Sequence, residues 1–242
     1  MLGDFLRLQI FLSHSGVCSR RKALDLIQTG HVTVNGARIV KPSTPINPQQ
    51  DKVCLDGKLV GVKKFEYILL NKPAGITTTK KDRFAKRTVM DILPKSLCHL
   101  HPVGRLDKDT EGLLLLTNDG SLTHKLTHPR FEVEKTYFVQ AKGRLQLSDV
   151  RRLENGMIID NIKTASAKIR DVVSKTDRTD FFFTIHEGRK RQIRVMMHKV
   201  GHPVLRLKRL TQGPLKLGSL KPGEFRHLTM AEIEKVQRMI SH

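Results

Sequence analysis

The sequence is poor in cysteine and has no long apolar segment. Its three cysteines, Cys18, Cys54 and Cys98, are odd in number and widely spaced, and they form no C-x-x-C pair. This pattern indicates neither a disulfide framework nor a zinc ribbon, and it is typical of a reducing cytosol. No apolar run of about 18 residues and no signal peptide is present. We therefore expect a soluble, cytoplasmic protein without a membrane partner.

The sequence also lacks the glycine-rich turns that hold nucleotides. Neither G-x-G-x-x-G nor G-x-x-x-x-G-K-[ST] occurs, which removes the usual signatures for a bound nucleotide, NAD or a methyl donor. We expect that the chemistry needs no cofactor. One metal site is conceivable at Cys98-His99-x-His101, since alternate residues of a strand share a face. No further Cys or His lies at ligand spacing nearby, so packed or solvated histidines are the simpler interpretation and no metal is predicted.

Acidic residues are far outnumbered by basic ones. The chain has 44 Lys and Arg against 23 Asp and Glu, a formal charge of +21 on 242 residues. Such an excess repels itself unless a polyanion is the usual partner, and nucleic acid fits best. The 38% hydrophobic content is enough for a core, and the length favours two unequal domains.

The first 60 or so residues resemble a small helical and hairpin unit. Ser19 is a predicted N-cap and Gly30 a stop for a helix whose first turn contains Arg20, Arg21 and Lys22. Cations there oppose the helix dipole, and a bound phosphate would reverse that penalty. A solvated basic face is the alternative. Asn35-Gly36 between two apolar runs predicts a hairpin.

A larger domain follows the polar join Gly61-Val62-Lys63-Lys64, so that the predicted domains are 1–61 and 62–242. It begins with the apolar strand Tyr67–Leu70 and mixes strands with short helices, one of them beginning at the capping box Thr229-x-x-Glu232. Further strands are predicted at 113–117, 136–141, 181–185 and 204–207. The pattern indicates an α+β fold with a mixed or antiparallel sheet, not a parallel βαβ sheet.

The most informative string is GRLDKDTEGLLLLTNDG at 104–120. Its four leucines predict a strand buried on both faces, so the preceding charged loop abuts the core. The acids Asp107, Asp109 and Glu111 could simply pair with Arg105 and Lys108. The glycines Gly104 and Gly112 favour a special site instead, because they permit close backbone approach.

This string resembles the catalytic motif of the RsuA family of ribosomal RNA pseudouridine synthases, and residues 8–60, with their VTVNG string, resemble an S4-like RNA-binding domain. The resemblance implies that Asp107 is catalytic, that Arg105 binds substrate, and that Asp109 and Glu111 are local loop structure. It also implies that Arg20, Arg21 and Lys22 bind RNA backbone.

Further strings match the family in order. EKTYFV at 134–139 implies that Tyr137 stacks on the target base or forms a hydrogen bond near it, although a tyrosine in an apolar strand is more often core. EGRKRQIRVMM at 187–197 implies that Arg194 pairs with the catalytic Asp107, that Ile193 packs in the site wall, and that Arg189, Lys190 and Arg191 face RNA. NKPAGITTT at 71–79 implies that Lys72 lies near the substrate. The string GEFRHL at 223–228 resembles the closing strand, while Met196, Met197 and His198 depart from the arginines usual in relatives.

The resemblance predicts isomerisation of a uridine in ribosomal RNA. A monomer is expected, since no unexplained apolar stripe requires a partner. NKPAGITTT and RTVMDILP look closer to the large-subunit, RluB-like members, with small-subunit ribosomal RNA as the alternative substrate. A non-catalytic ribosome assembly factor and a ribosomal RNA methyltransferase are rivals from other classes. The trio Asp107, Tyr137 and Arg194 argues against the first, and the missing methyl-donor turn argues against the second.

Overall fold

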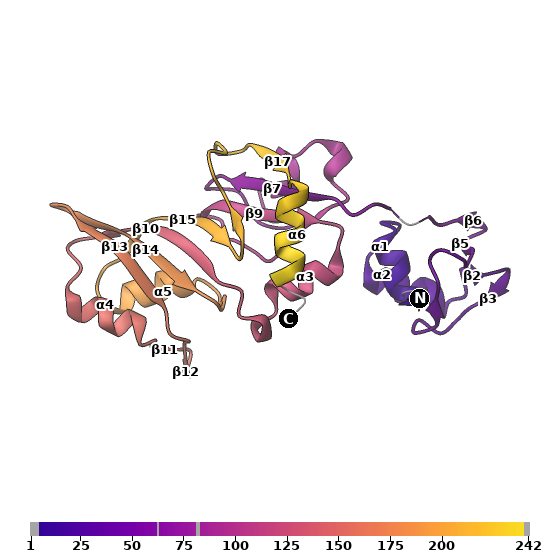
Figure 1. The fold of residues 1–242 in the computed structure, drawn as a ribbon, viewed down its shortest axis with the longest axis horizontal. Coiled ribbons are helices and arrows are strands. Elements are labelled where there is room, and N and C mark those ends of the chain that lie inside the picture. Colours follow the sequence, from indigo (N-terminus) through magenta and orange to yellow (C-terminus); the bar gives the residue numbers. More distant parts are fainter. Residues whose placement is uncertain (1–4, 62, 81–82, 240–242) are drawn as a thin grey trace. The chain divides into compact units, whose positions relative to one another are not determined.

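A computed structural model describes residues 5–61, 63–80 and 83–239 and divides the chain into two compact units (Figure 1). The first extends to Glu66 and includes Asn118–Gly120, and the second comprises Tyr67–Thr117 and continues from Ser121. The predicted boundary includes Val62, which lies outside the described residues. No helix of the described part is long and apolar enough to cross a membrane.

The first unit packs two helices against a small antiparallel sheet with the strand order β3-β2-β5-β6, and β1 pairs with β4. Its elements are β1 (Leu6–Arg7), α1 (Leu8–His14), α2 (Arg20–Gln28), β2 (Val32–Val34), β3 (Ala37–Arg38), β4 (Pro45–Ile46), β5 (Val53–Leu55) and β6 (Lys58–Leu59). The helices and strands share one core, in which Leu8, Leu12 and Ile27 are fully buried.

Two local predictions in this unit are confirmed. The Ser19 side chain accepts a hydrogen bond from the backbone N–H of Lys22 at 3.2 Å, as an N-cap does. Asn35 and Gly36 adopt positive φ angles of 52° and 84° between β2 and β3, the geometry of a tight hairpin turn.

The second unit is built on a mixed sheet with the order β13-β14-β10-β15-β9-β7-β17, in which β15 and β9 are parallel (Figure 1). Its strands are β7 (Tyr67–Lys72), β8 (His101–Pro102), β9 (Glu111–Thr117), β10 (Lys135–Lys142), β13 (Lys168–Ser174), β14 (Arg178–Ile185), β15 (Val204–Gln212), β16 (Leu215–Lys216) and β17 (Phe225–His227), with a separate hairpin of β11 (Ile158–Ile159) and β12 (Ile162–Lys163). The predicted α+β class with a mixed sheet is confirmed.

Helices cover both faces of this sheet. They are α3 (Gly120–Thr127), α4 (Leu147–Glu154), α5 (Gln192–Lys199) and α6 (Met230–Met239), with short 3-10 turns at Val89–Ile92, Lys95–Leu97 and Pro129–Phe131. Leu114 and Leu116 of β9 face the core that α4 and α5 complete, whereas Leu113 and Leu115 face the core of α3 and α6. The prediction that this leucine run is buried on both faces is confirmed, and so is the Thr229–Glu232 capping box.

Gly112 permits the close approach of β9 to β15, where it pairs with Arg209. Its φ is +102°, and a Cβ atom there would lie 2.2 Å from the carbonyl oxygen of Arg209 and 2.7 Å from its nitrogen. Backbone atoms in the middle of a sheet cannot move aside cheaply, so only glycine fits.

Gly112→Ala should therefore destabilise the protein by several kcal/mol, on the order of 3 or more, because it adds a backbone clash to left-handed strain. Urea unfolding checks this against Gly201→Ala, where φ is +85° but nothing lies within 4 Å of the added Cβ. Equal losses in the two variants would contradict the proposed clash.

Candidate active site

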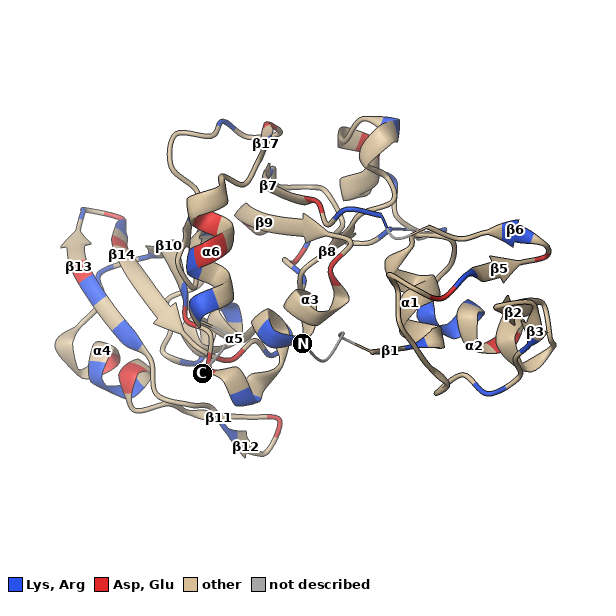
Figure 2. Cartoon of the chain, turned by 45° about the vertical axis from the view of Figure 1, so that its right-hand side comes forward, with Lys and Arg blue, Asp and Glu red and all other residues tan. Residues whose placement is uncertain are grey.

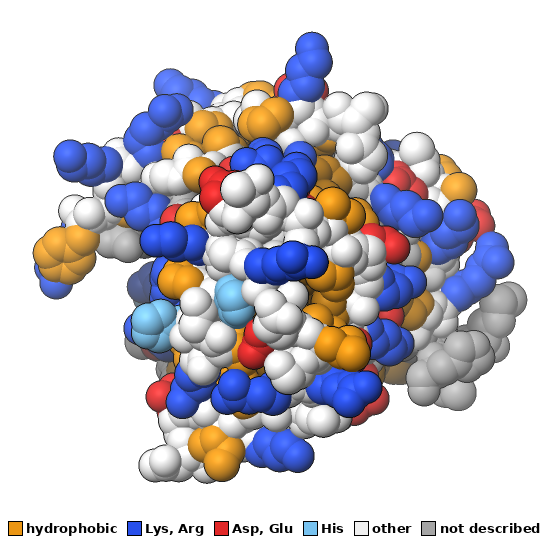
Figure 3. All heavy atoms as spheres, turned by 90° about the vertical axis from the view of Figure 1, so that its left-hand side faces the viewer, with side chains coloured by type: hydrophobic (Ala, Val, Ile, Leu, Met, Phe, Trp, Pro, Cys, Tyr) orange, Lys and Arg blue, Asp and Glu red, His pale blue; other side chains and the backbone are white. Residues whose placement is uncertain are grey.

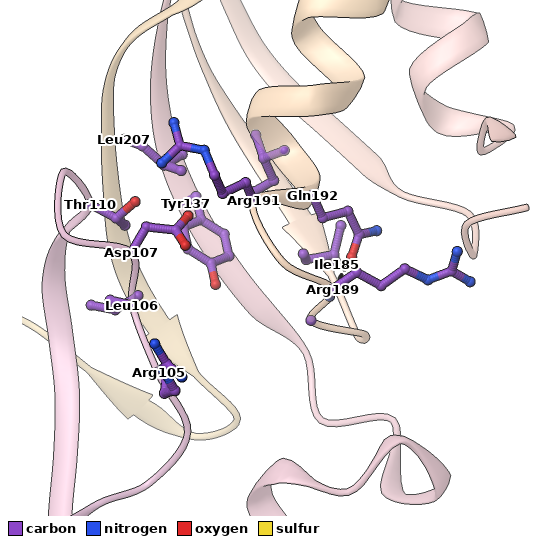
Figure 4. A pocket seen from close by; sticks show the side chains of 12 residues that line it. Arg105, Leu106, Asp107, Thr110, Tyr137, Ile185, Arg189, Arg191, Gln192 and Leu207 are labelled. Atoms are coloured by element: carbon purple, nitrogen blue, oxygen red, sulfur yellow. Dashed lines mark hydrogen bonds between the residues drawn. The ribbon is translucent and has the colours of Figure 1, made fainter. Parts of the chain in front are cut away.

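The loop between β8 and β9 presents Asp107 to a small cavity of about 80 Å³. Part of the wall is apolar and buried, and most of this part comes from β10, β14, β15 and the start of α5 (Figure 4). The apolar part consists of Leu106, Tyr137, Ile185, Ile193 and Leu207, and the other lining residues are mostly polar or charged. In Figure 4 the carboxylate of Asp107 lies beside the ring of Tyr137. An acid held beside an aromatic ring and apolar side chains can act on a flat, uncharged ligand.

The three acids of this loop differ in their partners. Asp109 accepts two hydrogen bonds from Arg191, at 3.1 and 3.2 Å, and Glu111 accepts two from Arg206, at 3.2 and 2.9 Å. Within the described part of the chain, the carboxylate of Asp107 has no ion pair and no hydrogen bond. Asp109 and Glu111 are thus paired, but with arginines of α5, of its N-cap and of β15 instead of the expected Arg105 and Lys108, whereas Asp107 is left available for chemistry.

Arg194 does not contact the expected carboxylate. We predicted a pair with Asp107, but the Arg194 Nε lies 3.4 Å from Oδ2 of Asp109, and its Nη2 donates to the Asp109 carbonyl oxygen at 2.9 Å. The loop turns at this point, with the Thr110 N–H bonded to the Asp107 carbonyl, which directs Asp109 toward α5 and Asp107 into the cavity. Arg194 still acts on Asp107 through space, since that carboxylate is among the charges that raise the pKa of Arg194 against the lowering effect of burial.

Asp109 is held ionised by this arrangement. Burial raises its pKa, but the hydrogen bonds from Arg191 and the charge of Arg194 outweigh burial and lower the pKa overall. Arg191 occupies the N-cap of α5 with φ +54°, an unusual angle for a residue other than glycine. The Asp109 pairs therefore fix the loop against α5 and set the position of Asp107.

Arg189 and Lys72 are placed differently from the predictions. The Arg189 guanidinium donates to the carbonyl oxygens of Ile162 and Lys163 at 3.0 and 2.8 Å, so it anchors the β11–β12 hairpin instead of facing free toward RNA. Lys72 is fully buried, and its Nζ donates to the carbonyl oxygens of Pro73, Ile76 and Lys108. It cannot contact a substrate directly, and it ties the segment after β7 to the Asp107 loop.

The buried ammonium of Lys72 makes stability depend on pH. Burial lowers its pKa to about 8 from 10.5, against the opposing effects of Asp109, Asp107 and Glu111. Between these two values the unfolded chain binds more protons than the folded chain, so stability rises with pH in that window. We expect a gain of up to about 3 kcal/mol from this group.

Unfolding by urea at pH 8 and pH 10 measures the gain, and Lys72→Met isolates it from other titrating groups such as Lys135. The pH-dependent rise should be smaller in the variant by about the stated amount. An identical rise in both proteins would show that Lys72 is not the source.

The remaining predicted residues lie as follows. Arg105 is exposed at the rim of the cavity, and Ile193 is 3% exposed in its wall. Arg20, Arg21 and Lys22 are exposed on the first turn of α2, and Figure 2 shows these basic residues on that helix and others along β13. In Figure 3 basic side chains spread over the visible face of the second unit with few acids among them.

The conceivable metal site has a different arrangement. His99 Nδ1 lies 2.8 Å from the carbonyl oxygen of Ser96, and His101 Nε2 lies 3.2 Å from Oγ1 of Thr123. In the part of the chain that is described, no group of three or more His, Cys, Asp or Glu could hold a metal ion.

Sequence reasoning missed several residues of the cavity. Thr110, Ile185, Gln192 and Leu207 line it without having been predicted. Ile185 and Leu207 lie on predicted strands, but only the register, with Lys135 opposite Ile185 and Val139 opposite Leu207, shows that they reach the Asp107 loop.

Comparisons with known proteins agree with this geometry. Residues 66–199 match the model of the RNA pseudouridylate synthase family, and residues 6–52 match that of the S4 domain. The chain is 39% identical to the ribosomal large subunit pseudouridine synthase B of Bacillus subtilis, over 98% of this chain and 97% of that protein. It is 37% identical to an uncharacterized RNA pseudouridine synthase of Aquifex aeolicus, over 97% and 95%.

A solved structure is also similar. A crystal structure of a pseudouridylate synthase superposes with a TM-score of 0.68 at 31% identity, covering 96% of this chain and 99% of that one. The similarity therefore includes both units and the whole of the sheet that carries the site.

Proposed function

Because the chain belongs to the RNA pseudouridylate synthase family and is a pseudouridine synthase, we propose that it isomerises a uridine of large-subunit ribosomal RNA, with Asp107 as the catalytic carboxylate. The observation that carries the assignment of Asp107 is its position in the cavity beside Tyr137, as an acid that no other described residue pairs.

The reaction fits a site without a cofactor. The bond from ribose C1′ to uracil N1 breaks, the base rotates, and a new bond forms from C1′ to C5. The hydrogen of C5 leaves as a proton and N1 gains one, so atoms and electrons balance without a redox partner. A carboxylate can add to the sugar or the base, or remove a sugar proton. Each route requires Asp107 in its charged form.

The apolar part of the wall supports binding of a flipped base. A uridine inside folded RNA must leave its stack, at a cost of a few kcal/mol, before any side chain can reach its sugar. Tyr137 is 8% exposed and offers the ring for stacking. Arg105 at the rim would contact the RNA from which the base has left.

The S4-like unit, with Arg20, Arg21 and Lys22 exposed, would bind RNA backbone and raise the local concentration of the synthase unit. We propose that its boundary lies near residue 61 and that the protein acts as a monomer on ribosomal RNA or an assembling subunit. The large subunit is favoured because the relative from Bacillus subtilis is named for it.

Release of tritium from RNA transcribed with uridine labelled at C5 tests the proposal, because isomerisation frees that hydrogen. Wild type should release it from large-subunit but not from small-subunit ribosomal RNA. Release from the small-subunit RNA alone would make the subunit assignment wrong. No release from either RNA or from assembling subunits would reject the proposed function.

A further inference from the structure

A second cavity, of about 130 Å³, lies beside the first. The two share Arg105, Tyr137 and Gly188 in their walls. The second cavity adds a polar wall from β10 and β15, which consists of Lys135, Arg209 and Gln212. A polar, basic cavity therefore adjoins the one that contains Asp107.

The sheet register builds this wall. Lys135 pairs with Gln212, and Tyr137 pairs with Arg209. A single residue lies between Lys135 and Tyr137 on β10, whereas two residues lie between Arg209 and Gln212 on β15. The register shift leaves Leu210 as the extra residue of a bulge, and Leu210 packs on the opposite core. Bulges of this kind redirect side chains next to active sites. Here the bulge places Gln212 and Arg209 on the same face as Tyr137.

The cations of this wall lack counter-ions. Arg209 is 2% exposed, and its Nε donates to the carbonyl oxygen of Leu113, but its Nη2 is buried without a partner. Lys135 Nζ donates to the carbonyl oxygens of Val133 and His186, and its pKa is lowered to about 8 by burial and then by Arg209. Among the described residues neither forms an ion pair. Unpaired buried charge is costly, which indicates that a bound anion completes the site.

The acid at this cavity does not balance the charge. Glu187 Oε1 accepts hydrogen bonds from the Ala165 N–H and from Gln192 Nε2, and its Oε2 lies 3.4 Å from Nε of Arg189. It is thus engaged within the protein. Gln212, 1% exposed, contributes an Oε1 that is also buried without a partner.

We propose that this second cavity binds a phosphodiester group of the RNA substrate, adjacent to the flipped uridine, through Arg209 and Lys135. The inference rests on the proposed function, because the chain that enters the first cavity must carry its flanking phosphate past the shared wall. Arginine and lysine are the usual donors to phosphate, and phosphate contacts fix the register of a nucleic acid. A ribose hydroxyl next to that phosphate supplies a donor for Gln212. Arg209 is then a positioning residue that aligns the ribose with Asp107.

The experiment compares how the rate of isomerisation changes when the phosphate loses its charge and when Arg209 is replaced. Isomerisation is followed in a single turnover on a stem-loop that contains the mapped site, with a neutral methylphosphonate replacing each flanking phosphate in turn. Proteins are wild type, Arg209→Met, Lys135→Met and the control Lys208→Met, whose side chain leaves the same strand on the other face. Thermal unfolding shows which variants fold.

One methylphosphonate should slow wild type by about 10- to 100-fold, the value of a hydrogen bond to a charged group. On normal RNA, Arg209→Met should be slower than wild type by about the same factor. The methylphosphonate should slow this variant little further, because the substitution and the modified phosphate remove the same contact. Lys208→Met should respond like wild type. The proposal would be overturned if the methylphosphonate slowed Arg209→Met by the same factor as wild type. It would also be overturned if a methylphosphonate at neither flanking position slowed wild type. If Arg209→Met does not fold, Lys135→Met decides by the same criterion.

Melting temperatures measured with inorganic phosphate show whether the second cavity binds a free anion and not a phosphate of the RNA. If inorganic phosphate raises the melting temperature of wild type but not of Arg209→Met, while both methylphosphonates leave the rate unchanged, the cavity binds free phosphate and the RNA assignment is wrong. If wild type forms no pseudouridine at all, the proposed function fails first. The same melting experiment then shows whether the cavity binds an anion, and no shift would remove the site altogether.

Discussion

Replacement of Asp107 by asparagine should abolish isomerisation and leave the fold and the RNA affinity intact. Asparagine has the same shape but cannot act as a charged nucleophile or base, so we expect the single-turnover rate to fall by about four orders of magnitude or more. Stability should be unchanged or higher, because this carboxylate has no protein partner to lose among the described residues. Tritium release and urea unfolding measure the two quantities.

Asp109→Asn is the matched control, because it removes an acid of the same loop that is paired. It weakens contacts to Arg191 and Arg194, so it should lower stability by about 1 to 3 kcal/mol and slow the reaction much less than Asp107→Asn does. If the two variants lost activity equally, the assignment of chemistry to the unpaired acid would not hold.

Arg194→Met should slow the reaction by about 100- to 1000-fold at saturating RNA, with little change in RNA affinity. The guanidinium side chain is 12% exposed, and it supplies positive charge beside Asp107 while holding the Asp109 backbone. Its loss therefore affects the rate of the chemical step more than binding. Arg194→Lys keeps the charge but not both contacts, so it should recover only part of the rate.

Arg206→Met provides the comparison, since it breaks the pair with Glu111, the first residue of β9 after the Asp107 loop, but lies outside the cavity. Its rate should stay within a few-fold of wild type, and the dissociation constant of each variant should be measured alongside. A nearly normal rate for Arg194→Met, or an equal loss in Arg206→Met, would show that Arg194 does not act on Asp107.

Local rules were enough to predict the parts of the fold that depend on neighbouring residues. The turn at Asn35-Gly36, the cap at Ser19 and the capping box at Thr229 require only the conformational preferences of a few adjacent residues. The burial of the β9 leucines could also be predicted, because a run of apolar residues without alternation is typical of a strand covered on both faces.

Contacts between distant segments could not be predicted in the same way. The partner of Arg194 depends on how the Asp107 loop turns against α5, and the burial of Lys72 depends on where the carbonyl of Lys108 lies. The second cavity depends on the β15 bulge, since an unshifted register would turn Gln212 to the opposite face from Arg209. These features arise from register and loop geometry, which no periodicity in one strand reveals.

The most direct test of the central claim is a map of pseudouridines in ribosomal RNA from cells that lack this protein, by carbodiimide modification and reverse transcription. The deletion is complemented with wild type or with Asp107→Asn at equal protein levels. The account predicts that a large-subunit pseudouridine disappears in the deletion and returns only with wild type. Its persistence in the deletion strain without a redundant synthase, or its return with Asp107→Asn, would contradict the account.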